Sequence, residues 1–168
     1  ILGLVGSEMC IRDRSNIHVL RDKLNDFKKS GKFVISYAEY YSLGSYYISS
    51  VADQVYLYPE GMLDYRGLRT ELMFFKGAIE KYGLDVQIIR GSGNDFKSAV
   101  EPFMYNKMSD ENRFQLKSIL TTLWNNMNQD IGDSRKITNN NLNQIADSVL
   151  AYNASGSLNQ NLIDATLY

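Results

Sequence analysis

The chain has 168 residues, enough for one domain with a sizeable hydrophobic core. Its 18 basic and 19 acidic residues give a net charge of −1, which offers no electrostatic basis for binding nucleic acid or an anionic membrane surface. The single cysteine, Cys10, excludes an internal disulfide and a cysteine-based zinc site, and the single histidine, His18, argues against a histidine metal centre or a Ser/His/Asp triad. No apolar run reaches about 18 residues, so the sequence predicts no membrane span.

Residues 1–14 differ in character from the rest of the chain. A signal peptide has a basic start, an apolar run and a small-residue cleavage site, whereas this segment has a short apolar start followed by Ser-Glu-Met-Cys-Ile-Arg-Asp-Arg. That string looks like translated sequencing-adapter read-through. We interpret 1–14 as a non-native segment and 15–168 as a partial domain, truncated at both ends.

The first half of the chain alternates between helical and strand patterns. Apolar residues recur at helical spacing from Ile17 through Leu20 and Leu24 to Phe27, and Gly31 follows as a stop signal. His18 lies on this helix among polar residues, so we expect a solvent-exposed histidine. The elements predicted next are a strand at Phe33–Tyr37, a helix at Leu43–Ala52, a strand at Gln54–Tyr58 stopped by Pro59 and Gly61, and a helix at Leu72–Tyr82 ended by Gly83.

The second half is predicted to hold one more strand and then helices. Pro102 suits the first turn of a helix, because its missing N–H is not needed there. Ser109 and Thr138 are expected to be N-caps. The predicted elements are a strand at Val86–Ile89, a loop at Gly91–Asn94, a long helix with an apolar face from Leu116 to Ile131, a last helix carrying Leu142, Ile145 and Val149, and a short segment at Leu158–Tyr168.

This alternation predicts the fold class. Strands that alternate with helices favour right-handed βαβ units, in which a mainly parallel sheet is flanked by helices. We therefore expect an α/β domain.

Two other sets of residues are candidate functional groups. The tyrosines at 40, 41, 46 and 47 could line a peptide groove, but clustered tyrosines more often pack in a core. Asp53, Asp64 and Glu71 have no partner at metal-ligand spacing, so we expect surface or structural roles for them.

Lys97 is the residue best suited to chemistry. It lies between an apolar strand and a helix begun by proline, flanked by Phe96, Ala99 and Val100. A free lysine has a pKa near ~10.4 and is protonated at neutral pH, but apolar burial disfavours the charged amine and lowers the pKa. A neutral amine can then take the proton of a serine hydroxyl and activate it. The alternative is a solvated lysine near Glu101, and an ion pair with Glu101 would raise the lysine pKa.

The stretch Phe96-Lys97-Ser98-Ala99-Val100-Glu101-Pro102-Phe103 is also a specific motif. Further marks are Ser30-Gly31-Lys32, Tyr46-Tyr47-Ile48-Ser49-Ser50, Ala52-Asp53, Pro59, Gly61, Met108-Ser109 and Asn161-Leu162-Ile163-Asp164-Ala165. With these marks, the chain from about Leu20 to Met127 resembles the amino-terminal domain of the long, two-domain form of the signal peptide peptidase A (protease IV) family. The resemblance implies a crotonase/Clp-protease-like fold and makes Lys97 the general base of a Ser/Lys dyad.

The resemblance also identifies the nucleophile position. Family domains that carry the serine have a pattern similar to Ala-Ser-Gly-Gly-Tyr-Tyr-Ile-Ser, and here the corresponding stretch begins Ser42-Leu43-Gly44-Ser45. The position falls on Leu43, which has no nucleophilic atom. A shift of one residue turns a helical side chain by about 100°, so Ser42 and Ser45 are interpreted as polar residues of a helix start. Consecutive residues point in different directions, so we do not expect Ser98 to pair directly with Lys97, and we expect it to hold the start of a helix.

The resemblance implies a serine endopeptidase that degrades remnant signal peptides. Residues 15–168 would be part of its amino-terminal peptidase domain, which supplies the lysine, while a second domain supplies the serine. The implied partners are a peptide substrate, that serine-bearing domain and further copies in a homo-oligomer, a tetramer by resemblance, with no nucleic acid, cofactor or metal. The implied location is the periplasmic side of the bacterial inner membrane, and this fragment alone is expected to be inactive.

Two alternatives stay open at this point. One is a non-catalytic half-domain that serves oligomer assembly. The other is an acyl-CoA enzyme of the crotonase type, which would need paired amides for a thioester oxyanion and usually acidic catalytic residues; no feature of the sequence favours it.

Overall fold

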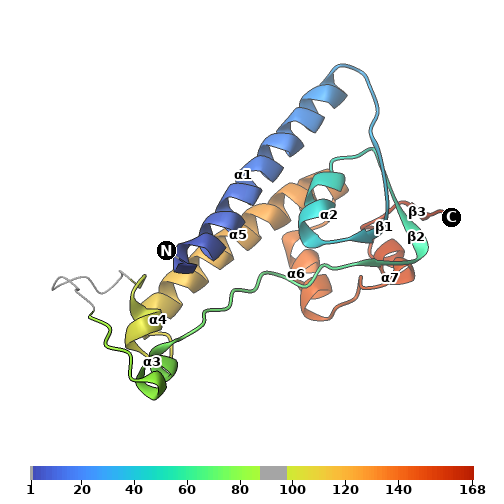
Figure 1. Ribbon diagram of the computed structural model, residues 1–168. Coiled ribbons are helices and arrows are strands. Elements are labelled where there is room, and N and C mark those ends of the chain that lie inside the picture. The colour runs from blue at the N-terminus through green and yellow to red at the C-terminus, as the bar shows by residue number, and fades with distance from the viewer. Residues whose placement is uncertain (1, 88–97) are drawn as a thin grey trace. The chain divides into compact units, whose positions relative to one another are not determined.

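The computed structural model describes residues 2–87 and 98–168, with helices and strands arranged as Figure 1 shows. The elements in chain order are α1 (Leu2–Lys29), β1 (Ile35–Tyr41), α2 (Leu43–Ser49), β2 (Gln54–Leu63), α3 (Lys76–Tyr82), α4 (Glu101–Met104), α5 (Asp110–Arg135), α6 (Asn139–Asp147), α7 (Ala154–Asn159) and β3 (Ala165–Thr166). They form two compact units: a larger one of Cys10–Gly67 and Trp124–Tyr168, and a smaller one that includes Leu68–Leu123. Within the described ranges, no helix has the length and apolar character needed to cross a membrane.

The larger unit contains a three-stranded parallel sheet in the order β1-β2-β3. The first pairs join Ile35 to Gln54 and Ala38 to Leu57, and β3 adds through the pair of Leu57 and Thr166. Parallel strands need a crossover between them, which α2 provides between β1 and β2. The expected α/β class, with a parallel sheet and flanking helices, is confirmed.

Strand β2 runs to Leu63, so the prediction that Pro59 and Gly61 stop it was wrong. The reason is a break in register: after Ala38 pairs with Leu57, pairing resumes with Tyr40 and Met62, so β2 carries extra residues. Pro59 lies in this irregular stretch, where no ladder hydrogen bond has to come from its nitrogen. A Cβ at Gly61 would lie 2.5 Å from the carbonyl oxygen of Glu39 in β1, so only glycine allows this close approach.

Aromatic side chains build much of the core of the larger unit. Tyr41, Tyr46 and Tyr65 are buried and meet edge to face, with ring centroids 6.1 Å apart for the first pair and 6.0 Å for the second. Trp124 continues the chain of rings, 5.5 Å from Tyr65. Aliphatic residues complete the core, among them Val55, Leu57, Leu63, Ile131, Leu142, Ile145, Leu162 and Ile163.

Helix α1 turns an unexpected residue toward this core. The sequence predicts an apolar face through Leu20 and Phe27, yet these side chains are 48% and 44% exposed, while Arg21 is 3% exposed. The Arg21 guanidinium donates to Ser50 Oγ at 2.7 Å and to the Asp130 carbonyl at 2.6 Å, and it stacks over the Tyr47 ring. Arginine can be buried when its fork of donors is satisfied, and apolar periodicity does not reveal that.

The smaller unit contains α3, α4 and the first part of α5. Helix α3 begins at Lys76, four residues after the predicted start at Leu72. It ends as predicted, at Gly83, whose φ of 62° is the left-handed conformation that glycine adopts without strain. Val86 and Gln87 have no strand structure, so the predicted strand at Val86–Ile89 is wrong for these two residues, and its remainder lies outside the described ranges.

The helix caps agree with the sequence. The Ser109 hydroxyl accepts from the Asn112 N–H at 3.1 Å at the start of α5, and the Thr138 hydroxyl accepts from the Asn141 N–H at 3.3 Å at the start of α6. Pro102 lies in the first turn of α4, as expected. Leu142 and Ile145 of α6 are buried, whereas Val149 lies beyond the end of the helix and is 45% exposed.

Candidate functional site

Lys97, the predicted base, lies outside the residues that the structure describes, and so does Phe96. Its role therefore stays a prediction. Ser98 is the first residue of the motif that the structure describes, and α4 begins three residues later at Glu101. The carbonyl of Ser98 accepts from the Glu101 N–H at 3.0 Å, while the N-cap residue of α4, Val100, makes no side-chain cap bond. Ser98 thus helps to hold the helix start through its backbone.

Glu101, the acidic residue of this motif, is buried, with 1% of its surface exposed. Ser109 Oγ donates to Oε1 at 2.6 Å, and Asn112 Nδ2 donates to Oε2 at 2.8 Å. Ser109 and Asn112 come from the start of α5, so the carboxylate joins α4 to the next helix. From the sequence, Glu101 was considered only as a possible ion-pair partner of a solvated Lys97. The residues around it in the sequence gave no sign that its side chain is buried.

A second set of contacts holds α4 in place, and these contacts come from Phe75, the residue before α3. The N–H of Phe75 donates to the carbonyl of Pro102 at 2.6 Å, and the rings of Phe75 and Phe103 stack with centroids 5.8 Å apart. The short helix after Lys97 is therefore held between the residue that precedes α3 and the first turn of α5.

A hollow of about 450 Å³ lies on the smaller unit. Lys76 lines it from α3, together with residues 105–109, which join α4 to α5. Among the described residues of this lining, Ser109 alone has an aliphatic hydroxyl, and that hydroxyl is bonded to Glu101 and to the Asn112 N–H. The Ser109 hydroxyl is used in these two structural hydrogen bonds, so we do not assign it as a nucleophile.

At the start of α2, the position expected for a nucleophile is occupied by Leu43, the first residue of the helix. Ser42 is its N-cap, and its Oγ accepts from the Ser45 N–H at 3.2 Å. The Ser45 hydroxyl donates to the Ser42 carbonyl at 3.0 Å. Both hydroxyls therefore serve the helix start, which confirms the structural interpretation of these two serines.

The tyrosines of the Tyr-Tyr motifs mostly pack in the core. Tyr41, Tyr46 and Tyr47 are buried, while Tyr40 is 51% exposed. Tyr46 OH donates to the Leu162 carbonyl at 2.7 Å, and burial raises the pKa of its phenol well above the ordinary value. Burial also raises the pKa of Tyr47, and the hydrogen bond from its OH to Asp130 adds to this effect. These phenols are neutral hydrogen-bond donors rather than a peptide groove.

The exposed His18 lies at the edge of this cluster, with Nδ1 3.3 Å from Tyr47 OH. Asp53, for which the sequence predicts a surface or structural role, is structural: it accepts from the Val34 N–H at 2.8 Å and pairs with Lys28 at 2.8 Å. No group of three or more potential metal ligands occurs within residues 2–87 and 98–168.

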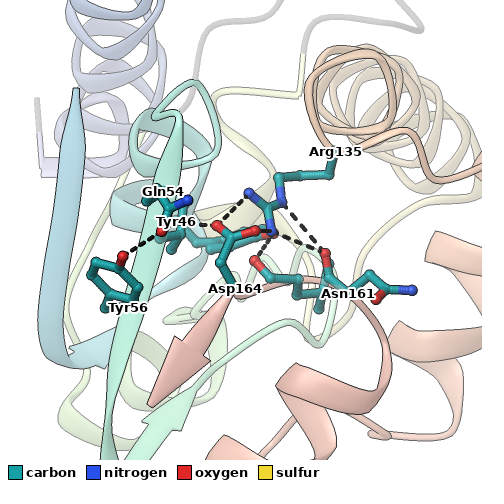
Figure 2. A network of polar contacts seen from close by, with 8 residues as sticks. Tyr46, Gln54, Tyr56, Arg135, Asn161 and Asp164 are labelled. Carbon is teal, nitrogen blue, oxygen red and sulfur yellow. Dashed lines mark hydrogen bonds and ion pairs between the residues drawn. The ribbon is translucent and has the colours of Figure 1, made fainter. Parts of the chain in front are cut away.

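The closing segment of the chain is fixed by the ion pair that Figure 2 shows. Two guanidinium nitrogens of Arg135 donate to the two oxygens of Asp164, at 2.9 and 3.0 Å. Arg135 also donates to the carbonyl of Asn161, and Asp164 Oδ2 accepts from the Val55 N–H at 2.7 Å. This network fastens the segment before β3 to α5 and to β2.

Comparisons with known proteins agree with this geometry. Residues 26–168 match the model of peptidase family S49. Protease 4 of Haemophilus influenzae is 40% identical over 114 residues, and Protease 4 of Salmonella typhi is 31% identical over 126 residues. The chloroplastic serine protease SPPA of Arabidopsis thaliana is 27% identical over 118 residues.

These matches cover 68%, 75% and 70% of this chain, but 18%, 20% and 17% of the three relatives. The chain thus spans about a fifth of the length of these relatives. The family model covers far more than half of the chain, and the parallel sheet flanked by helices fits the crotonase/Clp-protease-like fold of that family. The chain belongs to peptidase family S49.

Proposed function

We propose that this chain is the lysine-bearing part of a bacterial serine endopeptidase that degrades remnant signal peptides. Lys97 is its general base, and the nucleophilic serine comes from another domain. The observation that supports this proposal is the start of α2, where the position that the resemblance assigns to the nucleophile holds Leu43 and both neighbouring serines are bound into the helix cap. The relatives named Protease 4 support peptide hydrolysis as the chemistry.

The reaction proceeds by covalent catalysis. The neutral amine of Lys97 takes the proton of the serine hydroxyl as the serine oxygen bonds to the peptide carbonyl carbon. The C–N bond then breaks, and the ammonium returns its proton to the leaving amine, which leaves an ester on the serine. Water attacks this ester, the amine again takes and returns the proton, and the serine is restored.

The proposal extends to the assembly and location of the protein. It acts as a homo-oligomer, by resemblance a tetramer, on the periplasmic side of the bacterial inner membrane. The same proposal makes residues 1–14 a non-native segment and 15–168 part of an amino-terminal peptidase domain.

The first test replaces Lys97 in the protein at its full length. Lys97→Ala and Lys97→Arg should both abolish cleavage of an apolar peptide substrate, because neither side chain can serve as a base near neutral pH. Lys117→Ala, at an exposed lysine of α5, is the matched control and should keep full activity. Retained activity in Lys97→Ala would favour the scaffold alternative.

The second test locates the nucleophile. A fluorophosphonate probe should label a serine outside residues 1–168, and Lys97→Ala should suppress that labelling. Labelling of Ser42 or Ser45 would contradict the proposal. The pH–rate profile should show an essential base that titrates well below ~10.4, because a base near the value of free lysine is incompatible with a neutral amine at work.

A further inference from the structure

The parallel sheet of the larger unit has two faces of different character. On one face, Val55 and Leu57 of β2 are fully buried in the core, and their partners in β1, Ser36 and Ala38, are partly buried. Because side chains alternate along a strand, the residues between these positions lie on the other face. That second face has no role in the reaction proposed above.

All three strands contribute to this second face. Tyr37 of β1 pairs with Tyr56 of β2, and Tyr56 pairs with Ala165 of β3. Beyond β3, the ring of Tyr168 meets that of Tyr58 edge to face, with centroids 5.8 Å apart. We call this surface the outer sheet face, and its main side chains are those of Phe33, Ile35, Tyr37, Tyr56, Tyr58 and Tyr168.

The outer sheet face exposes enough apolar area to bind a partner. Phe33, Tyr37 and Tyr168 are 75%, 48% and 94% exposed, and at about 200 Å² for a whole aromatic side chain they present roughly 400 Å². Ile35, which is 54% exposed, adds to this area. Parallel sheets are normally covered on both faces, and apolar patches of this size mark interaction surfaces. Two such faces in contact would bury roughly 1,000 Å² in total, near the lower limit for a specific interface.

The charged residues around the face are divided between its two ends. Lys32 precedes β1, Glu39 lies near the carboxyl end of β1, and both residues are exposed. Glu60 of β2 is a second exposed acid at the carboxyl end. At the amino end, Lys28 and Asp53 form an ion pair at 2.8 Å and together add no net charge. The face is therefore basic at one end and acidic at the other.

This division of charge fits a second copy of the same chain. A two-fold axis that lies between two faces and runs across the strands stacks β1 on β1 with the strand directions reversed. The basic end of each copy then lies opposite the acidic end of the other, and symmetry makes this contact twice. An axis along the strands would instead place like charges together.

We propose that two copies of this chain pair through the outer sheet face, with reversed strand directions and with Lys32 of each copy near Glu39 of the other. In the single chain the Lys32 amine lies 5.0 Å from the centre of the Phe27 ring, and an exposed contact of this kind can be exchanged for a carboxylate at little cost. The inference goes beyond the proposed function, because neither Lys97 nor the reaction enters it, so either can fail without the other.

Sedimentation equilibrium of the 168-residue chain tests the pairing. We expect a reversible monomer–dimer equilibrium with a Kd in the micromolar range. Tyr37→Asp should raise the Kd by at least about 30-fold, because it buries a carboxylate in the centre of the face on both copies. Circular dichroism of each variant checks that it is folded. Lys81→Glu, at an exposed lysine of α3, is the control and should leave the Kd unchanged.

Charge reversal tests the direction of the strands. Lys32→Glu and Glu39→Lys should each raise the Kd by about 5-fold, because each change opposes like charges at two symmetric places. The double variant, Lys32→Glu with Glu39→Lys, should restore the original Kd. Hydroxyl-radical labelling of Tyr37 should fall as dimers form, while labelling of Tyr82, which is 75% exposed on α3, should not change.

Three outcomes would overturn the inference. The first is a chain that stays monomeric at every concentration. The second is a dimer that survives Tyr37→Asp, or one whose Kd is not restored in the double charge variant, because such a dimer uses another surface or another arrangement. The third is a monomer, of this chain or of the full-length protein, in which Tyr37 is as protected from labelling as the buried Tyr46, because another part of the same polypeptide then covers the face.

Discussion

Replacing Asp164 by asparagine tests whether the closing segment depends on its ion pair. The carboxylate accepts two bonds from Arg135 and one from the Val55 N–H. Asparagine has nearly the same shape but only one acceptor oxygen and no charge. The substitution therefore removes the fork-to-fork pairing shown in Figure 2 without opening a cavity.

The size of the effect follows from the exposure of the two groups. The Arg135 side chain is 9% exposed and that of Asp164 is 33% exposed. Hydrogen bonds to a charged group contribute about 1.5–3 kcal/mol, and partial exposure to solvent places this pair toward the lower end, at about 2 kcal/mol. For a chain of this size, that loss corresponds to a fall in Tm of about 4–8 °C at neutral pH.

The effect should depend on pH with a definite sign. Burial opposes ionisation of Asp164, but the hydrogen bonds from Arg135 and from the Val55 N–H outweigh it and hold the pKa of that carboxyl below its usual range. A depressed carboxyl pKa stabilises the folded state above the unfolded value, near ~3.9. This stabilisation is lost as the pH falls through the lower, folded value.

Urea unfolding of the 168-residue chain at pH 7, 5, 4 and 3 is the appropriate assay. The difference in unfolding free energy between the original chain and Asp164→Asn should be largest at pH 7 and 5 and shrink below pH ~4. Asp26→Asn, at a surface acid paired with Lys29, is the control and should change the midpoint little. A difference that is negligible at pH 7, or constant down to pH 3, would refute this account of the ion pair.

Three further substitutions test the core. Tyr46→Phe should cost about 1–2 kcal/mol in urea unfolding, because the Leu162 carbonyl loses its donor; an unchanged midpoint would mean that water replaces the phenol. Gly61→Ala should cost about 1–3 kcal/mol in thermal unfolding followed by circular dichroism, because the new Cβ meets the Glu39 carbonyl, and wild-type melting would contradict that contact. Arg21→Lys should lower the melting temperature, because an ammonium cannot reproduce the guanidinium fork, and equal melting would show that the charge alone suffices.

Local signals predicted the helix boundaries where the deciding atoms are close in sequence. Ser109 and Thr138 cap helices because a hydroxyl reaches an N–H three residues later. Gly83 ends α3 because it can adopt the left-handed conformation. In each case the interacting groups, or the backbone dihedral angle, lie within one turn of the chain. The local sequence is therefore enough to predict where the helix begins or ends.

The features that the sequence missed depend on partners that are distant in the chain. Pro59 and Gly61 looked like breaks in a strand, and only the register with β1 shows that they lie inside one. Arg21 looked like a polar position on α1, and only its acceptors at the C-terminal end of α2 and on α5 explain its burial. The same holds for Glu101, whose donors come from the next helix.

The candidate site residues could be predicted from the sequence mainly because their motifs resemble those of a known family. The apolar setting of Lys97 suggested a candidate base, and only the family pattern led to the expectations that this lysine belongs to a Ser/Lys dyad and that the nucleophile position falls on Leu43. In the structure, the hydroxyls of Ser42 and Ser45 bond at the start of α2, as their position at a helix start predicts.

The chain of aromatic rings in the larger unit also provides an intrinsic fluorescence signal for folding. Trp124 is the single tryptophan of the sequence, and Tyr65 lies 5.5 Å from it, with Tyr46 and Tyr41 following at similar spacing. Light absorbed by these tyrosines will therefore pass to one indole and emerge as tryptophan emission while the core is intact. When β1, α2 and α5 separate, the transfer ends and tyrosine emission returns, so loss of this core can be followed without any attached dye.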